Sequence, residues 1–82
     1  MDKFYKAVVE TSAGTFQIRP LTLCSLAVEE EGVDGLVDVI NLDAIEADLW
    51  APESLIPALI SWIYEMRRGV GILSANLQLA DS

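Results

Sequence analysis

Two short segments near the start of the chain alternate between apolar and polar side chains, with the two-residue period of a β-strand. Residues 4–10 follow this period, and residues 15–19 repeat it with Phe16 and Ile18 on one face. The segment between them has the composition of a turn, and its Gly14 can adopt a positive φ. We therefore predict an N-terminal β-hairpin.

The middle of the chain carries signals of helix starts and stops. We expect Pro20 to end the second strand because it lacks a backbone N–H, and Thr22 to cap a first helix that Gly32 stops. Two further short helices are expected over residues 34–41 and 43–50. The second of them opens with an aspartate and, three residues later, a glutamate, which is the spacing of a capping box.

The strongest helical signal covers residues 55–68. Ser54 can cap this helix, and Pro57 falls in its first turn, where the missing N–H costs nothing. The apolar side chains form an arc about twice as wide as the roughly 100° stripe of a helix that packs on one side only. Two sides should therefore be covered, either by the sheet and the short helices or, beside Ile60 and Tyr64, by a second subunit or a client protein.

After Gly71 the two-residue period returns, because leucine and alanine alternate with polar side chains from Leu73 to Leu79. A strand here could join the hairpin, and a frayed helix or mobile tail is the alternative. The predicted fold is a single α+β domain over residues 1–82. It has an N-terminal β-hairpin, three to four helices and a C-terminal strand that joins the sheet.

Composition narrows the class of function. The chain has 82 residues, is 52% hydrophobic and carries a net charge of −8. This hydrophobic content is incompatible with intrinsic disorder, and the charge argues against binding to nucleic acid or to an anionic membrane surface. A domain of this size buries only about 60% of its unfolded surface. We therefore expect some apolar surface to remain exposed, and the partner to be a protein or further copies in a homo-oligomer.

The negative charge is concentrated in the middle of the chain. Between Arg19 and Arg67 there is no Lys or Arg, whereas the same segment holds ten carboxylates. These can form a solvated face that keeps the chain soluble, a docking surface for a basic partner, or a divalent-metal site. The EF-hand spacing is absent and the chain has no histidine, so we predict no metal site. The candidate partner-binding residues are Glu29, Glu30, Glu31, Asp38, Trp50, Ile60, Trp62 and Tyr64.

The chain lacks the residues of common catalytic sites. Without histidine there is no Ser-His-Asp or Cys-His arrangement. Cys24 has no second cysteine to pair with, which favours a reducing compartment such as the cytoplasm, and in the expected first helix it would be buried rather than reactive. The longest apolar stretch, residues 55–64, is shorter than the ~18 residues that span a bilayer. We predict a non-enzymatic, cytoplasmic protein with no catalytic residues and no cofactor.

The run from Gly14 to Leu26, GTFQIRPLTLCSL, resembles the opening of the small tail assembly chaperones of tailed phages. In that family a hairpin leads through Pro or Leu and then Thr into the first helix. The likeness covers residues 14–31, and a looser likeness in layout extends to Gly69. It implies a non-enzymatic protein of the bacterial host cytoplasm that binds the tape-measure or tail-tube protein during tail assembly.

The residues also leave two alternatives open. One is an acidic inhibitor or nucleic-acid mimic that occupies a basic groove on a host protein. The other is a structural subunit that self-assembles through the last helix or the edge of the C-terminal strand.

Overall fold

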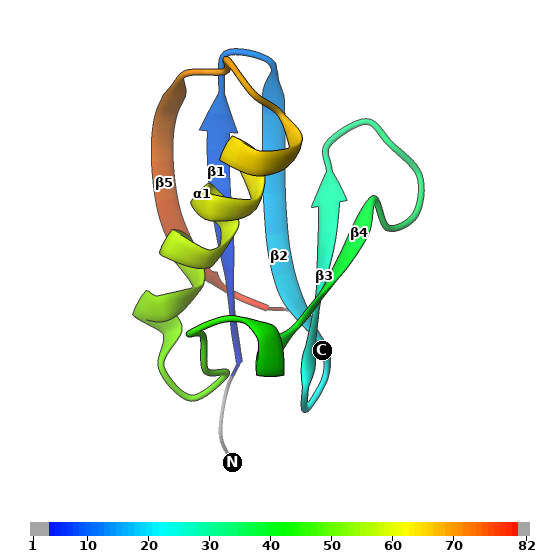
Figure 1. The fold of residues 1–82 in the computed structure, drawn as a ribbon, viewed down its shortest axis with the longest axis vertical. Coiled ribbons are helices and arrows are strands. Elements are labelled where there is room, and N and C mark those ends of the chain that lie inside the picture. The colour runs from blue at the N-terminus through cyan, green and yellow to red at the C-terminus, as the bar shows by residue number, and fades with distance from the viewer. Residues whose placement is uncertain (1–3, 81–82) are drawn as a thin grey trace.

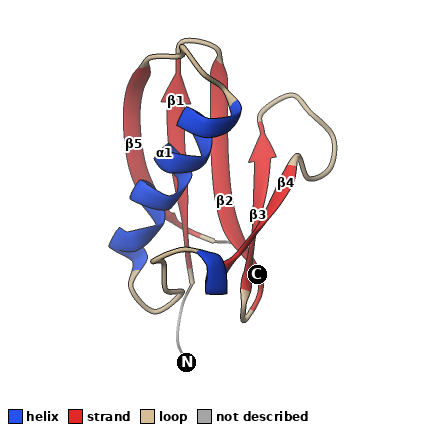
Figure 2. Ribbon diagram, in the orientation of Figure 1, coloured by secondary structure: helices blue, strands red, loops and turns tan. Residues whose placement is uncertain are grey.

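One antiparallel sheet with a single α-helix across one face makes up the computed structural model, which describes residues 4–80 (Figures 1 and 2). The strands are β1 (Tyr5–Thr11), β2 (Gly14–Thr22), β3 (Ser25–Glu30), β4 (Asp38–Asn41) and β5 (Ile72–Leu79). Two 3₁₀ turns, η1 (Leu42–Ala44) and η2 (Pro52–Ser54), precede the helix α1 (Leu55–Met66).

The five strands lie in the order β4-β3-β2-β1-β5, and every neighbouring pair is antiparallel. The chain runs through β1 to β4 as a meander. It then returns along α1 to the opposite side of the sheet, where β5 pairs with β1 (Figure 1). The predicted hairpin and the predicted C-terminal strand are confirmed, and residues 72–79 are neither a helix nor a tail. The predicted count of three to four helices is wrong.

The first predicted helix is strand β3. Thr22 does use its side chain as predicted, but to close a tight turn: Thr22 Oγ1 accepts a hydrogen bond from the Cys24 amide at 3.2 Å and shares another with Ser25 Oγ at 2.7 Å. Leu26 and Val28 are then completely buried on the face beneath α1. Pairing with β2 on one side and β4 on the other outweighs the helix propensity of this segment. Cys24 lies in the turn and is exposed, so its predicted burial is also wrong.

Pro20 does not end the second strand, which continues to Thr22. The pairing of β2 with β1 stops at Ile18, opposite Ala7, so Pro20 lies where β2 is paired with β3 alone. The β2–β3 register is irregular just beyond Pro20. A proline can be accommodated at such a position because few ladder hydrogen bonds depend on it.

The helices predicted over residues 34–41 and 43–50 are also absent. Residues 38–41 form β4, and the loop before it turns at Gly32 and Gly35, where φ is 88° and 78°. The capping signal is real but comes from another residue: the Asn41 side chain accepts from the Asp43 amide at 3.0 Å and begins a 3₁₀ turn of three residues. The chain then continues without regular structure to Trp50, apart from an isolated bridge formed by Asp48.

The last predicted helix is confirmed as α1, with Pro57 in its first turn. Ser54 stands at its start but does not cap it. Its hydroxyl instead donates to the Ala51 carbonyl at 2.6 Å and accepts from the Asp48 amide at 3.0 Å. The chain leaves the helix through Gly69, whose φ is 86°.

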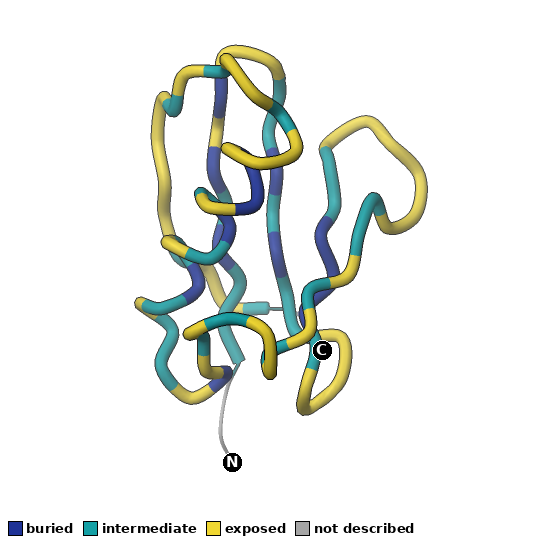
Figure 3. The backbone as a smooth tube through the Cα atoms, viewed as in Figure 1, coloured by how far each residue is buried: buried dark blue, intermediate teal, exposed yellow. Residues whose placement is uncertain are grey.

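The core lies between α1 and one face of the sheet (Figure 3). Alternate strand residues point toward the helix, as a period of two requires. The buried strand residues are Ala7, Val9, Phe16, Ile18, Leu26 and Val28, and those of the helix are Leu55, Leu59, Trp62 and Ile63. In the part of the chain that the structure describes, no element covers the other face of the sheet (Figure 1). No helix within residues 4–80 has the length and apolar character needed to cross a membrane.

Candidate functional site

The strand conformation separates the three consecutive glutamates. Glu29 points to the open face, where it accepts from Arg19 through two hydrogen bonds of 3.0 and 3.1 Å and from Gln17 at 2.6 Å. These bonds lower the pKa of the Glu29 carboxyl, chiefly through Arg19, and the hydrogen bonds that Arg19 donates to Glu29 raise the pKa of Arg19. Glu30 points to the helix side, where Arg67 approaches it at 3.4 Å. Glu31 is exposed beyond the end of β3. The three carboxylates therefore do not form one anionic surface.

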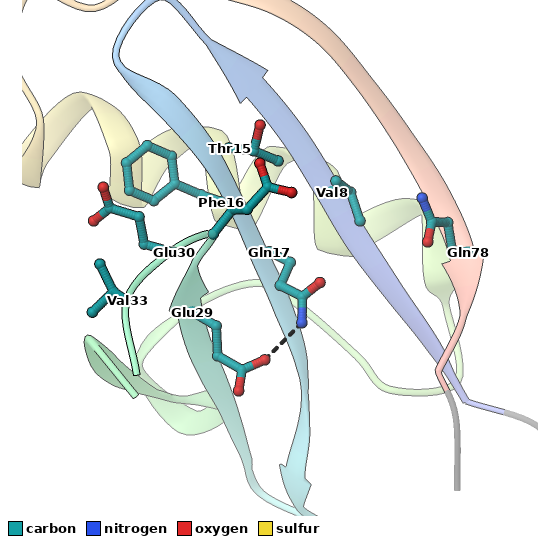
Figure 4. A pocket seen from close by; sticks show the side chains of 9 residues that line it. Val8, Thr15, Phe16, Gln17, Glu29, Glu30, Val33 and Gln78 are labelled. Carbon is teal, nitrogen blue, oxygen red and sulfur yellow. Dashed lines mark hydrogen bonds between the residues drawn. The ribbon is translucent and has the colours of Figure 1, made fainter. Parts of the chain in front are cut away.

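A hollow of about 410 Å³ lies where β2 begins and β3 ends (Figure 4). It is lined by Val8, Thr15, Phe16, Gln17, Glu29, Glu30, Glu31, Val33 and Gln78. Figure 4 shows Gln17 and Glu29 pointing toward each other from neighbouring strands. Gln17, Glu29 and Glu30 thus already bind one another or an arginine, and the third carboxylate of the hollow, Glu31, is exposed to solvent. This arrangement leaves few groups directed at a ligand.

A second and larger space, of about 550 Å³, is a groove between α1 and the segment formed by β4 and η1. It exists because the helix covers the sheet from β5 to β2 and leaves β4 without a layer above it (Figure 1). The groove is lined by Val39, Ile40, Asn41, Ala44, Ile45, Glu46, Pro57, Ala58, Ser61, Trp62 and Glu65. Its body is mainly apolar, and its two charged residues, Glu46 and Glu65, are both acidic and exposed.

Trp62 forms one wall of this groove and is held in place from three sides. Its indole Nε1 donates to Asp38 Oδ2 at 2.8 Å, and its ring meets that of Phe16 at 5.7 Å between centroids. The Arg67 guanidinium lies 5.3 Å from the centre of the Trp62 ring. Asp38 also accepts from the Val39 amide at 2.8 Å, and these two bonds, chiefly that from Trp62, lower the pKa of its carboxyl. A ligand in the groove would thus meet a wall that is fixed before it binds.

The structure brings together two of the predicted partner-binding residues, Asp38 and Trp62. Ile60 is half-buried against the core, whereas Tyr64 is 58% exposed on the outer side of α1. The helix is therefore not enclosed on two sides. Trp50 is 57% exposed and packs its ring against Phe4 at 5.0 Å, away from the groove lining.

Sequence reasoning missed most of the apolar residues that line the groove. Val39 and Ile45 belong to segments predicted as helices, and Ala58 gave no separate signal. Only Val37, Asp38 and Val39 alternate between apolar and polar side chains, which is compatible with a strand but is too short a run to indicate one.

Within residues 4–80, no three cysteine, aspartate or glutamate side chains come together as ligands for a metal ion. Every buried side-chain nitrogen or oxygen in the same range has a hydrogen-bond partner. Comparisons of the chain with protein-family models, with curated proteins and with solved structures found no significant match.

Proposed function

We propose that this protein is a non-enzymatic adaptor that binds a short apolar segment, bearing lysine or arginine, of a partner protein. The groove between α1 and β4 is the binding site. The observation that carries the proposal is the combination of an apolar body with a rim whose charged residues are Glu46 and Glu65. Such a groove suits an amphipathic helix or an extended peptide that lays its apolar side chains into the space.

The charge of the surroundings supports a basic partner. No lysine or arginine occurs between Arg19 and Arg67, so the charged side chains of α1 and of the β4–η1 segment are all carboxylates. Arg67, which follows α1 and lies on the Trp62 ring, is paired with Glu30. A basic segment would be attracted to this side of the molecule and an acidic one repelled. Trp62 supplies an aromatic wall, and its fixed position lowers the entropy lost on binding.

The tail assembly chaperones supply a specific form of this proposal. In that form the bound segment belongs to a tape-measure or tail-tube protein in the cytoplasm of the bacterial host. The likeness to that family now depends on the sequence of residues 14–31 alone, because the helix expected after Thr22 is strand β3. Co-expression with tape-measure and tail-tube proteins, followed by co-purification, tests this form separately from the groove itself.

The alternative of an acidic inhibitor or nucleic-acid mimic is less well supported. Such a protein needs a continuous row of free carboxylates, and two of its candidates, Glu29 and Glu30, are already bound by Arg19 and Arg67.

A labelled peptide tests the groove directly. The probe is a fluorescein-labelled peptide of about ten residues with leucines and three lysines, and its binding is followed by fluorescence anisotropy. We expect Glu65→Lys to weaken binding about fivefold or more, because it reverses one of the two rim charges. The matched control is Glu53→Lys, which makes the same charge change at an exposed residue outside the groove.

Two outcomes would contradict the proposal. One is equal weakening by Glu65→Lys and Glu53→Lys, which would mean that only the net charge matters. The other is equal affinity for a second peptide in which glutamates replace the lysines. Loss of binding with added salt, together with the difference between the two variants, supports the proposal.

A further inference from the structure

The strand β5 forms an open edge of the sheet that lacks the usual protection against pairing. It is eight residues long, and most of its side chains are exposed (Figure 3). Its sequence, ILSANLQL, contains neither a charged residue nor a proline. Edge strands in natural proteins are commonly blocked by one of these devices, or by being short. A long, uncharged edge therefore indicates a surface on which another strand pairs.

The opposite edge of the sheet shows the contrast. Strand β4 has only four residues and begins with the charged Asp38. Glu46 and Asp43 follow within a few residues of its end. One edge of this sheet is thus short and acidic, and the other is long and neutral. Strand β5 pairs with β1 in a regular register from Ser74 to Leu79, and the register shifts only at its start, opposite Glu10 and Thr11.

The hydrogen bonds of β5 identify the backbone groups that point outward. The Ala80 amide donates to the Phe4 carbonyl at 3.0 Å, so Ala80 points its backbone groups toward β1. Because these groups alternate along a strand, the amides and carbonyls of Ala75, Leu77 and Leu79 point away from β1. Among the described residues no strand lies on that side of β5 to receive them.

The lack of charge along this edge and its register favour a second copy of the chain as the occupant. A second copy, with its own charge of −8, is repelled by most of the surface, but residues 69–80 contain no charged side chain. The outward row is also self-complementary. With a two-fold axis at Leu77, this residue lies opposite its counterpart in the second copy, and Ala75 lies opposite Leu79. Leu77 and Leu79 share the face that α1 covers, because they are paired with Ala7 and Tyr5, so pairing buries apolar surface.

We propose that two copies of this chain pair antiparallel through β5 and form one continuous ten-stranded sheet with both helices on the same face. The contact is independent of the groove, which lies beside β4 at the far edge. A dimer of this kind therefore carries two outward-facing grooves, one at each end of the joined sheet.

The molar mass in solution tests the proposal, measured by sedimentation equilibrium between about 5 and 200 μM. The expected result is a species of twice the 9.0 kDa of one chain. The variant Ala75→Pro removes one outward amide and costs no β1–β5 hydrogen bond, because that amide points away from β1. It is expected to be monomeric with an unchanged circular dichroism spectrum, whereas the control Ala75→Val keeps the amide and stays dimeric.

A second variant covers the case in which Ala75→Pro does not fold. Leu79 is 48% exposed, and Leu79→Glu places a carboxylate opposite Ala75 of the second copy, where pairing would bury the charge without a partner, so this variant is also expected to be monomeric. A wild-type mass of 9.0 kDa throughout the concentration range would overturn the proposal. A dimer that persists in both folded variants would do the same, because it would have to form elsewhere on the molecule.

Discussion

The hydrogen bond from Trp62 to Asp38 permits a quantitative test of what holds the groove wall in place. Asp38→Ala removes the acceptor and leaves the indole N–H of a residue that is only 8% exposed without its partner. Hydrogen bonds to charged groups contribute about 1.5–3 kcal/mol. Asp38 is itself only half-buried, so water can replace part of the bond. We therefore expect a loss of about 1–2 kcal/mol in the free energy of unfolding.

Urea denaturation followed by circular dichroism at pH 7 measures this loss. In a domain of this size each 1 kcal/mol corresponds to roughly 4–8 °C in Tm, so thermal unfolding gives an independent value. The matched variant Asp38→Asn keeps a neutral oxygen as acceptor, and we expect about half the loss of Asp38→Ala.

The pH dependence gives this prediction its sign. The pKa of Asp38 is lowered in the folded protein from its ordinary value of 3.8, chiefly by the Trp62 hydrogen bond. Its contribution to stability is therefore complete above about pH 4 and is lost as the pH falls through the lowered pKa. The difference between wild type and Asp38→Asn should shrink over that acidic range. The argument would be refuted if the free energy of unfolding of Asp38→Ala lay within about 0.3 kcal/mol of the wild-type value at pH 7. It would also be refuted if the difference in this free energy between wild type and Asp38→Asn stayed constant as the pH was lowered.

Two further predictions concern turns between elements. Gly69→Ala should lower the free energy of unfolding by about 1–2 kcal/mol, because φ at this position is 86°. An added Cβ would meet nothing within 4 Å, so the whole effect is backbone strain, and an unchanged urea midpoint would contradict the left-handed conformation. Cys24 should react completely with a thiol reagent such as DTNB in the native protein, because it lies exposed in the β2–β3 turn; a thiol that reacts only in denaturant would contradict that placement.

The hairpin, the last helix and the terminal strand could be predicted because their signals are local. The two-residue alternation of β1 ends at the turn before Gly14, and both features lie within about ten residues. The apolar arc of residues 55–66 likewise shows the period of a helix within its own twelve residues. Thr22 shows where such reasoning ends. A threonine hydroxyl that accepts from an amide two residues later can begin a helix or close a turn between strands. Which of the two forms depends on whether a partner strand is present.

The groove could not be predicted for a related reason. It depends on Asp38 and Trp62, which are 24 residues apart and meet only because β4 pairs with β3 and α1 returns across the sheet. The same applies to the glutamates of β3. Whether Glu29 and Glu30 share a surface depends on the element that contains them, since consecutive side chains point about 100° apart on a helix and to opposite faces of a strand.

The way in which β5 joins the sheet also bears on the order in which the fold assembles. The hairpins β1–β2 and β2–β3 close loops of two residues, whereas β5 must find β1 after about 60 intervening residues. Closing the longer loop costs about 3 kcal/mol more in chain entropy, at about 0.6 kcal/mol for each doubling of length. The β1–β5 ladder should therefore form late during folding and be among the first to open. Until β5 pairs with β1, the amides of β1 that point away from β2 have no partner strand. Stopped-flow refolding with pulsed hydrogen exchange should therefore show these β1 amides becoming protected after the amides of β2 and β3.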